Sequence, residues 1–145
     1  MLQISKRIVN ELIAHARAEA PNECCGLLSG KERLASEIYK IGNLPADDPA
    51  IADLKVPPDR RFRYVMDPKE QLKAFKEMRK KGTELLAIYH SHPHSPAYPS
   101  PTDVRLAFYP DVHYVIISLE KEAPAVRAFR INDQKITEEA IEVLP

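Results

Sequence analysis

The segment Tyr89–Asp103, YHSHPHSPAYPSPTD, contains two histidines one residue apart, then several prolines and serines, and an aspartate. On a β-strand, residues i and i+2 project from the same face, so His90 and His92 would offer two neighbouring imidazoles while Ser91 points away. Imidazole nitrogen is a favoured zinc ligand, and a catalytic zinc typically has three protein ligands and a water molecule. The spacing therefore suits one metal ion, with Asp103 as the nearest candidate for the third ligand.

The stretch Ser100–Asp103, SPTD, also has the form of a helix start. Ser100 can serve as the N-cap, Pro101 fits the first helical position, and Asp103 can complete a capping box. The two interpretations are compatible, because a helix that begins at Ser100 fixes Asp103 on its first turn, and the loop after His92 can bring that turn back over the strand end. For the histidines alone, a solvent-facing pair is the alternative, since His-x-His by itself indicates a metal only weakly.

A central strand and a first helix must position these residues. Five consecutive apolar residues, Leu85–Tyr89, predict a strand that is covered on both faces and emerges at the histidines. Apolar residues at helical spacing predict a helix over residues 6–20, with Ser5 as its cap. The stretch ECCGLLSG then indicates a short buried strand, so the helix delivers the chain directly to Glu23.

The remaining segments predict an α/β fold, a mixed sheet flanked by helices. Further strands are predicted for ASEIYKIGN, RFRYVM, VHYVIISL and AVRAFRIN, and an extended or helical tail for residues 135–144. A second helix is predicted from the capping box DPKE at Asp67 to Gly82, with Leu72, Phe75 and Met78 facing the core, and a short helix over about residues 102–109. Segment 43–61 contains four prolines and no clear period, which is typical of a flexible insertion loop.

Length and composition exclude several classes of protein. A chain of 145 residues is one domain's worth of sequence, and we expect residues 1–145 to form a single domain. With 21 Lys and Arg residues against 21 Asp and Glu residues, nothing favours nucleic acid or a membrane as the partner. No apolar run reaches the length of a membrane span, and we expect a cytoplasmic protein. The only cysteines, Cys24 and Cys25, are adjacent, which is a poor geometry for a disulfide, so we expect both to be reduced.

The histidine segment is part of a longer pattern. The order H-S-H-P, six residues, S, two residues, D, with E-x-C-G-L-L upstream from Glu23, resembles the JAMM motif of the MPN+ family of zinc-dependent hydrolases. All elements of the motif are present at the family's spacing, and the resemblance covers nearly the whole chain. It implies a cytidine-deaminase-like MPN/JAMM domain with one Zn²⁺ per chain. It also implies that His90, His92 and Asp103 bind the zinc, that Glu23 contacts the water on the metal, and that Ser100 lines the oxyanion position.

The residue types suit these implied roles. Zinc can lower the pKa of bound water from about 15.7 to about 7, so that only a base is needed to take and return its proton. Glu23 can be that base and then the acid that protonates the leaving amine, and the Ser100 hydroxyl can stabilise a tetrahedral oxyanion. For Glu23 taken alone, a surface carboxylate beside a strand is the alternative. Cys24 and Cys25 fit better as buried core residues than as nucleophiles, because the histidines that would activate a thiol are better used by a metal.

Within this family, the chain looks closest to the small bacterial Mec-type enzymes of cysteine biosynthesis. That resemblance implies hydrolysis of the bond after the C-terminal Gly-Gly of a ubiquitin-like sulfur-carrier protein, which releases an amino acid such as cysteine. One alternative is a JAMM isopeptidase that removes ubiquitin-like modifiers from lysines; ubiquitin-chain enzymes carry an insertion after the motif, for which the short connection after Asp103 leaves no room. A second alternative is a non-catalytic MPN scaffold, which the complete motif disfavours. The sequence leaves a homodimer open.

Overall fold

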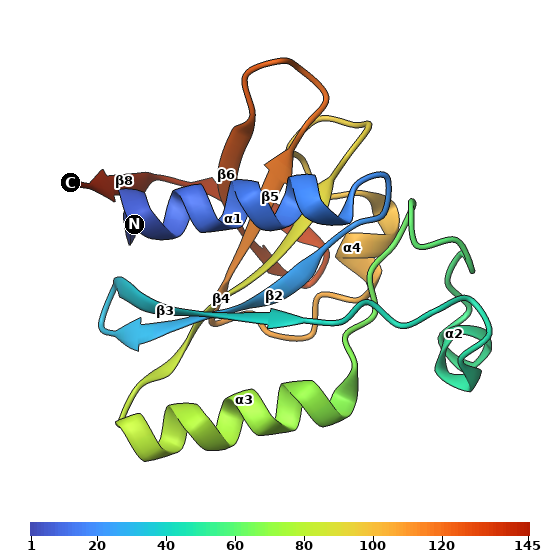
Figure 1. Ribbon diagram of the computed structural model, residues 1–145, viewed down its shortest axis with the longest axis horizontal. Helices are drawn as coiled ribbons and strands as arrows, with labels where there is room; N and C mark the ends of the chain where they lie inside the picture. The colour runs from blue at the N-terminus through green and yellow to red at the C-terminus, as the bar shows by residue number, and fades with distance from the viewer.

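An eight-stranded mixed sheet runs through the computed structural model, which describes residues 1–145 (Figure 1). In spatial order the strands are β7 (Lys135–Glu139), β6 (Ala125–Asn132), β5 (His113–Ser118), β4 (Glu84–His92), β2 (Cys25–Lys31), β3 (Leu34–Ile41), β1 (Leu2–Ser5) and β8 (Ile141–Leu144). Strand β4 runs parallel to β5, and β1 runs parallel to both β3 and β8, whereas the other neighbours are antiparallel. The predicted α/β class with a mixed sheet is confirmed.

Helices cover both faces of this sheet. The four helices are α1 (Lys6–Glu19), α2 (Pro49–Leu54), α3 (Pro68–Lys81) and α4 (Pro101–Arg105), and α1 and α3 are the two that cover the faces. The buried residues of α1 pack in one cluster with Leu28 and Tyr89, whereas those of α3 pack in another with Leu27 and Ile88. Because successive residues of a strand point to opposite faces, α1 and α3 lie on opposite sides of the sheet (Figure 1). None of the four helices has the length and apolar character that crossing a membrane requires.

Strand β4 lies in the interior of the sheet and carries both histidines at its C-terminal end. Residues 87–92 are all buried, as expected for a strand that is covered on both faces. On the α1 side, the Tyr89 hydroxyl lies 2.7 Å from Nδ1 of His15, so a buried hydrogen bond ties the strand to the helix. The predicted central strand is confirmed, and it presents the histidines from a rigid element.

The pairing of β2 with β4 brings the upstream glutamate to the histidines. The strands are antiparallel, with Cys25 opposite His90. Opposite residues of such a pair point to the same face, so the register continued by two residues places Glu23 beside the second histidine. On the other face, Ser91 Oγ accepts the Cys24 N–H at 2.8 Å, and the Ser91 N–H donates to the Cys24 carbonyl at 3.1 Å. These bonds hold the chain that precedes β2 against the end of β4.

The prediction of a strand at RFRYVM is wrong. Only Met66 makes an isolated bridge, with Asn43. The side chains also point opposite to the expected pattern, since Phe62 is 57% exposed and Arg63 is 1% exposed. The buried guanidinium bonds to loop carbonyls, and the chain turns around it instead of joining the sheet.

Helix α3 differs from the prediction in two contacts. Asp67 and Gly82 cap it as predicted, with Gly82 in the left-handed conformation. Met78 is buried as predicted and Phe75 packs against the same cluster, but Leu72 is 55% exposed, because the stripe that faces the sheet is centred on Ala74 and Met78. Glu70 does not reach back to the N-cap; its Oε1 accepts the backbone N–H of Gly42 at 3.2 Å. Other elements differ from the prediction too. The structure contains β1 and α2, which the sequence pattern does not indicate. Helix α4 ends at Arg105, and the C-terminal tail forms β7 and β8.

Candidate metal centre

Three side-chain atoms meet at the C-terminal end of β4. The Nε2 atoms of His90 and His92 lie 3.1 Å apart, and Oδ2 of Asp103 lies 3.1 Å from the first and 3.0 Å from the second. The three residues are 1%, 3% and 7% exposed, respectively. The structure therefore brings together, in a buried position, the three residues that the sequence predicts as metal ligands.

This arrangement needs a cation. The Pro96 carbonyl, 2.8 Å from His92 Nδ1, can only accept a hydrogen bond, so Nδ1 carries the proton. In the neutral ring, Nε2 then directs a lone pair at the Asp103 carboxylate, and the two repel unless a proton or a metal ion lies between them. Ligands of one tetrahedral zinc lie about 3.3 Å from one another, given bonds of about 2.0–2.1 Å. The separations of 3.0 and 3.1 Å therefore fit a single divalent cation held by two imidazoles and a carboxylate.

Burial and mutual contact set the charges of the three groups. Burial acts to raise the pKa of Asp103, but the two imidazoles outweigh it, and this pKa lies well below its usual range. Burial lowers the pKa of His90, against the opposing effect of the Asp103 carboxylate. Burial also acts to lower the pKa of His92, but the hydrogen bond and charge of Asp103, together with the hydrogen bond to the Pro96 carbonyl, outweigh it and the pKa is raised. Without a metal, His92 is therefore the ring that takes up a proton more readily.

A short helix holds Asp103 over the strand end. Ser100 Oγ accepts the Asp103 N–H at 3.1 Å, and Asp103 Oδ2 accepts the Ser100 N–H at 2.9 Å, which completes the capping box at the start of α4. The same carboxylate oxygen thus caps the helix and faces the histidines, and both interpretations of SPTD are realised in one geometry. The Ser100 hydroxyl accepts one hydrogen bond and keeps its own hydrogen available to donate.

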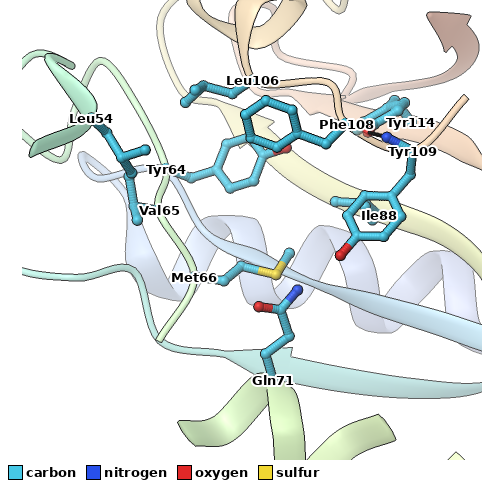
Figure 2. Close-up of a pocket in the computed structure, with 10 residues that line it drawn as sticks. All are labelled: Leu54, Tyr64, Val65, Met66, Gln71, Ile88, Leu106, Phe108, Tyr109 and Tyr114. Atoms are coloured by element: carbon cyan, nitrogen blue, oxygen red, sulfur yellow. Dashed lines mark hydrogen bonds between the residues drawn. The ribbon is translucent and has the colours of Figure 1, made fainter. Parts of the chain in front are cut away.

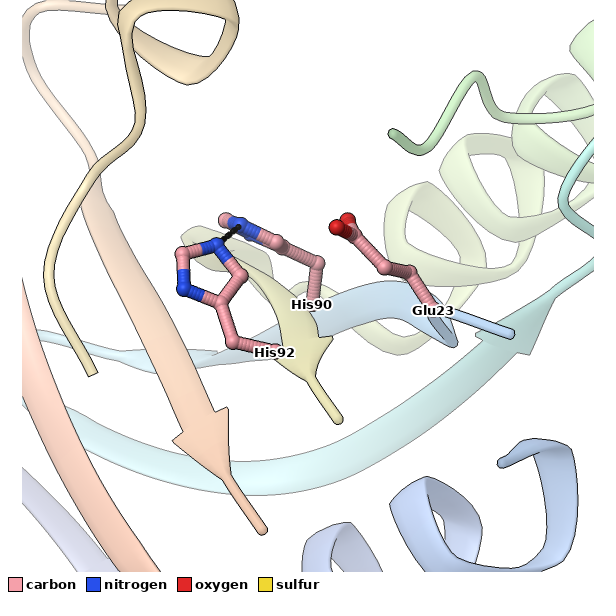
Figure 3. Close-up of side chains that lie close together, drawn as sticks. All are labelled: Glu23, His90 and His92. Carbon is pink, nitrogen blue, oxygen red and sulfur yellow. Dashed lines mark hydrogen bonds between the residues drawn. The ribbon is translucent and has the colours of Figure 1, made fainter. Parts of the chain in front are cut away.

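A buried carboxyl group faces the histidine pair (Figure 3). Ligand atoms of Glu23, His90 and His92 all lie within 4.8 Å of one another. Glu23 is 6% exposed, and its Oε1 has no hydrogen-bond partner. Burial, reinforced by the charge of Asp103, raises the pKa of Glu23 to about 9, while Arg63 acts in the opposite direction. In the metal-free protein, the Glu23 carboxyl is therefore protonated at neutral pH, and its unpaired oxygen marks room for a further polar ligand.

Segment 43–66 contributes residues to the site that sequence reasoning missed. The Tyr64 ring stacks on His90, with 4.4 Å between ring centroids and 23° between planes. The Asn43 side chain donates to the carbonyl of Glu23 at 3.0 Å and to that of Arg63 at 3.0 Å. These contacts join residues twenty or more positions apart, so no local periodicity could have indicated them.

The other reactive side chains lie outside the convergence point. Cys24 and Cys25 are free and buried. Burial raises the pKa of Cys24 to about 11 and that of Cys25 well above its usual range, so both remain thiols at neutral pH. His94 is exposed in the loop after β4. None of these three side chains joins the buried cluster.

An apolar pocket of about 210 Å³ adjoins the centre (Figure 2). Its lining includes Ile88 and Tyr114 from the sheet, Tyr64, and Phe108, which is 67% exposed. Ile88 lies two residues before His90 on the same face of β4, and Tyr64 stacks on that histidine. The pocket therefore begins beside one of the candidate ligands.

The buried carboxyl predicts a pH-dependent loss of stability in the metal-free protein. The pKa of Glu23 rises from 4.5 to about 9 on folding, so between these values the unfolded chain is ionised while the folded protein stays protonated. Stability therefore falls as the pH rises through this window. In chelator, Glu23→Gln should be more stable than wild type at pH 8 by on the order of a few kcal/mol, and by less than about 1 kcal/mol at pH 5. Urea unfolding measures both values, with the exposed Glu122→Gln as control; a pH-independent difference would contradict the prediction.

A family model and several named relatives match most of this chain. The family model described as prokaryotic homologs of the JAB domain matches residues 5–132. A relative from Mycobacterium tuberculosis named CysO-cysteine peptidase is 36% identical over 149 residues, which cover 99% of this chain and 92% of the relative. A relative from Thermus thermophilus, named a probable TtuB-protein conjugate cleaving protease, is 36% identical over 133 residues, which cover 92% of this chain and 78% of the relative.

Solved structures share the fold. A protein from Desulfitobacterium hafniense is 40% identical, with a TM-score of 0.82 over 99% of this chain and 92% of that one. A JAB1/MPN domain protein from Archaeoglobus fulgidus has the same fold, with a TM-score of 0.62 at 19% identity over 99% of this chain and 97% of that one. The motif, the family model and relatives named as a peptidase and a protease all agree: the chain belongs to the prokaryotic JAB-domain family of JAMM hydrolases.

Proposed function

We propose that this chain is a zinc-dependent peptidase that cleaves the bond after the C-terminal Gly-Gly of a ubiquitin-like sulfur-carrier protein and releases one amino acid, with cysteine as the first candidate. The observation that carries the proposal is the buried convergence of His90, His92 and Asp103 with the carboxyl of Glu23 beside it. The relative named CysO-cysteine peptidase, similar over nearly the whole chain, supports the substrate class. Two free cysteines support a reducing, cytoplasmic setting.

His90, His92 and Asp103 would hold the metal. A zinc ion in this place supplies Lewis acidity and lowers the pKa of bound water to about 7. The protein residues fix the lone pairs: Pro96 sets the tautomer of His92, and the capping box orients Asp103. The positive charge of such an ion would also favour the carboxylate form of Glu23, which burial and the charge of Asp103 keep protonated in the metal-free protein.

Glu23 then moves the proton. Its carboxylate takes a proton from the water whose oxygen bonds to the scissile carbonyl carbon. As the carbon–nitrogen bond breaks, Glu23 gives that proton to the leaving nitrogen, so the products are a free carrier carboxylate and a free amine. The Ser100 hydroxyl, at the start of α4, would donate to the carbonyl oxygen while that oxygen carries negative charge. Because the carboxyl of Glu23 is buried, bulk water does not compete for the transferred proton.

The surroundings of the site favour a small leaving group. Only the end of α4 and a short loop lie between Asp103 and β5, so no inserted element is present there to orient a folded acceptor protein. On the carrier side, a Gly-Gly tail lacks side chains and can lie close to the strand end. The apolar pocket beside His90 offers room for the side chain that precedes the two glycines.

An isopeptidase is the second candidate, and one observation favours it. The Thermus thermophilus relative, named for cleavage of TtuB-protein conjugates, is as similar to this chain as the cysteine-releasing one, at 36% identity. Both reactions use the same chemistry and differ only in the amine that leaves. A non-catalytic scaffold is disfavoured, because every residue of the motif is present and all four titratable members lie together in the interior.

We expect one zinc ion per chain. Removal of an imidazole leaves two protein ligands and an unsatisfied pocket, so His92→Ala should lose the zinc that wild type retains after dialysis. His94→Ala, which removes an exposed histidine of the loop that follows β4, is the matched control and should keep full zinc content. Elemental analysis measures both. Stoichiometric zinc in His92→Ala would place the metal elsewhere.

Glu23→Gln should keep the zinc and the fold but lose most activity. The amide has nearly the shape of the carboxyl but does not accept the proton of water, and general acid–base catalysis typically contributes on the order of 10²- to 10⁴-fold in rate. Steady-state hydrolysis and zinc content are measured on the same preparation. Activity within a few-fold of wild type in the metallated variant would remove Glu23 from the mechanism.

A direct comparison separates the two candidate reactions. One carrier ending in Gly-Gly is joined either to a single cysteine or, through an isopeptide bond, to a lysine of a second protein. We expect faster cleavage of the cysteine adduct, because no inserted element orients the larger acceptor. Mass spectrometry follows both products at equal carrier concentration, with chelated enzyme as control for contaminating peptidases. Faster cleavage of the isopeptide by a wide margin would make the second candidate the function.

A further inference from the structure

Arg63 is a buried cation without an anionic partner. Its side chain is 1% exposed, and it forms no ion pair with any carboxylate. The guanidinium instead donates to four neutral oxygens: Asn43 Oδ1 at 2.6 Å, the Leu44 carbonyl at 2.7 Å, the Pro57 carbonyl at 2.9 Å and the Pro58 carbonyl at 2.7 Å. Burying a charge in this way is costly, and packing alone gives no reason for it. The planar guanidinium thus joins the residues before α2, Asn43 and Leu44, to those after it, Pro57 and Pro58, and we call this set of hydrogen bonds the clamp.

Asn43 links this clamp to the candidate base. Its side-chain oxygen accepts from Arg63 Nη1 at 2.6 Å and from the Val65 N–H at 3.0 Å. Its side-chain nitrogen donates to the carbonyls of Arg63 and Glu23, both at 3.0 Å. All four hydrogen-bonding positions of the amide are therefore used, and they hold Asn43 in one orientation.

The main chain of Glu23 depends on the same segment. Glu23 precedes the first residue of β2, so no ladder partner holds it. Its N–H donates to the Arg60 carbonyl at 2.9 Å, and its carbonyl accepts from Asn43 at 3.0 Å. Both backbone groups of the candidate base are thus held by the segment that Arg63 organises. The next residue along from the clamp, Tyr64, stacks on His90.

We propose that Asn43 and Arg63 form one positioning unit, in which Arg63 shapes the segment and Asn43 transmits that shape to the backbone of Glu23. Neither residue touches the reacting atoms. The unit orients the Glu23 carboxyl toward the histidine pair and presses Tyr64 against His90. This inference rests on the proposed role of Glu23 as the base.

Asn43→Asp is the informative variant. The aspartate keeps the shape and the oxygen that Arg63 and Val65 bond, and its charge strengthens the contact with Arg63, so the clamp persists. It loses the two donors, and with them the bond to the Glu23 carbonyl. We expect kcat for the carrier adduct to fall by about 10- to 100-fold, the range seen when outer supports of a metal site are removed, while KM and zinc affinity change by less than about threefold. Asn22→Asp, which adds the same charge one residue before Glu23 without removing a side-chain hydrogen bond, should leave kcat within about twofold.

The same substitution in a Glu23→Gln background separates positioning from general damage. With no base left to misplace, Asn43→Asp should lower the residual single-turnover rate by less than about twofold. An equal loss in both backgrounds would show an effect on the fold or on the metal and would overturn the proposal. So would a wild-type kcat in the single variant.

Amide hydrogen exchange gives a readout that needs no substrate. The Glu23 N–H donates to the Arg60 carbonyl in the segment that Arg63 organises, so this amide should exchange at least about tenfold faster in Arg63→Lys than in wild type, with β4 and β5 unchanged. If wild type fails to cleave the carrier adduct, the proposed function fails while exchange still judges the hydrogen-bonded unit; unchanged exchange at Glu23 would overturn the unit itself. Should Asn43→Asp fold poorly, Arg63→Lys keeps the charge without the fork. It should lower both kcat and, because Tyr64 loosens from His90, zinc affinity by about 10-fold, and full retention of both would contradict the proposal.

Discussion

The lone pairs of His92 Nε2 and Asp103 Oδ2 face each other across 3.0 Å at the end of β4, with His90 Nε2 3.1 Å from both atoms, and the rest of this structure depends on that constraint. Two imidazole nitrogens and a carboxylate oxygen lie this close in a protein interior only where the fold holds them there and a proton or a metal ion offsets their repulsion. An interior strand fixes the two rings on one face, and a helix start delivers the carboxylate. The backbone carbonyl of Pro96 decides which nitrogen of His92 carries its proton. These contacts hold the three groups together, so a proton on His92 or a metal ion, and not rotation of the rings, offsets the repulsion between His92 and Asp103.

Two neighbouring ionisable groups, Glu23 and Arg63, are also buried where the dielectric constant is low. Burial keeps the pKa of Glu23 far above that of an ordinary carboxyl, and Arg63 lies buried among neutral acceptors. Either group would destabilise a protein that gained nothing from it, and such groups gather where a site has chemistry to perform. The two are also of opposite sign, and Arg63 favours the ionised form of Glu23. The interior thus holds a carboxyl group with a strongly raised pKa at the expense of some folding stability.

The sequence predicts those parts of the site that local chemistry determines. The i, i+2 spacing of the histidines and the capping box at Ser100 are properties of a few adjacent residues, and both appear as predicted. The antiparallel contact that brings Glu23 to them follows from strand pairing, which the apolar pattern indicates but whose register it does not fix. The role predicted for Glu23 rests on the motif, because no periodicity of the sequence distinguishes this residue from a surface carboxylate.

The missed parts depend on long-range bonds. RFRYVM resembles a strand because aromatic and β-branched residues alternate with arginine, and the alternation assigns Arg63 to solvent. In the structure Arg63 is buried instead. Its guanidinium donates to the carbonyls of Pro57 and Pro58 and to the side chain of Asn43, and the apolar pattern around Arg63 gives no sign of these acceptors. Leu72 of α3 is misplaced for a related reason, because which stripe of a helix is covered depends on where the sheet ends. The apolar pattern of the sequence thus predicts which segments enter the core better than it predicts which polar side chains are buried.

The facing lone pairs also bear on how much of this protein a cell contains. A cation that binds only the folded chain removes the repulsion and adds its binding free energy to stability, by an amount that grows with the free metal concentration. Chains made when metal is scarce would populate unfolded states more often, and proteases degrade such chains first. Abundance would therefore follow metal supply without any transcriptional control, because chains that lack the cation would be cleared first.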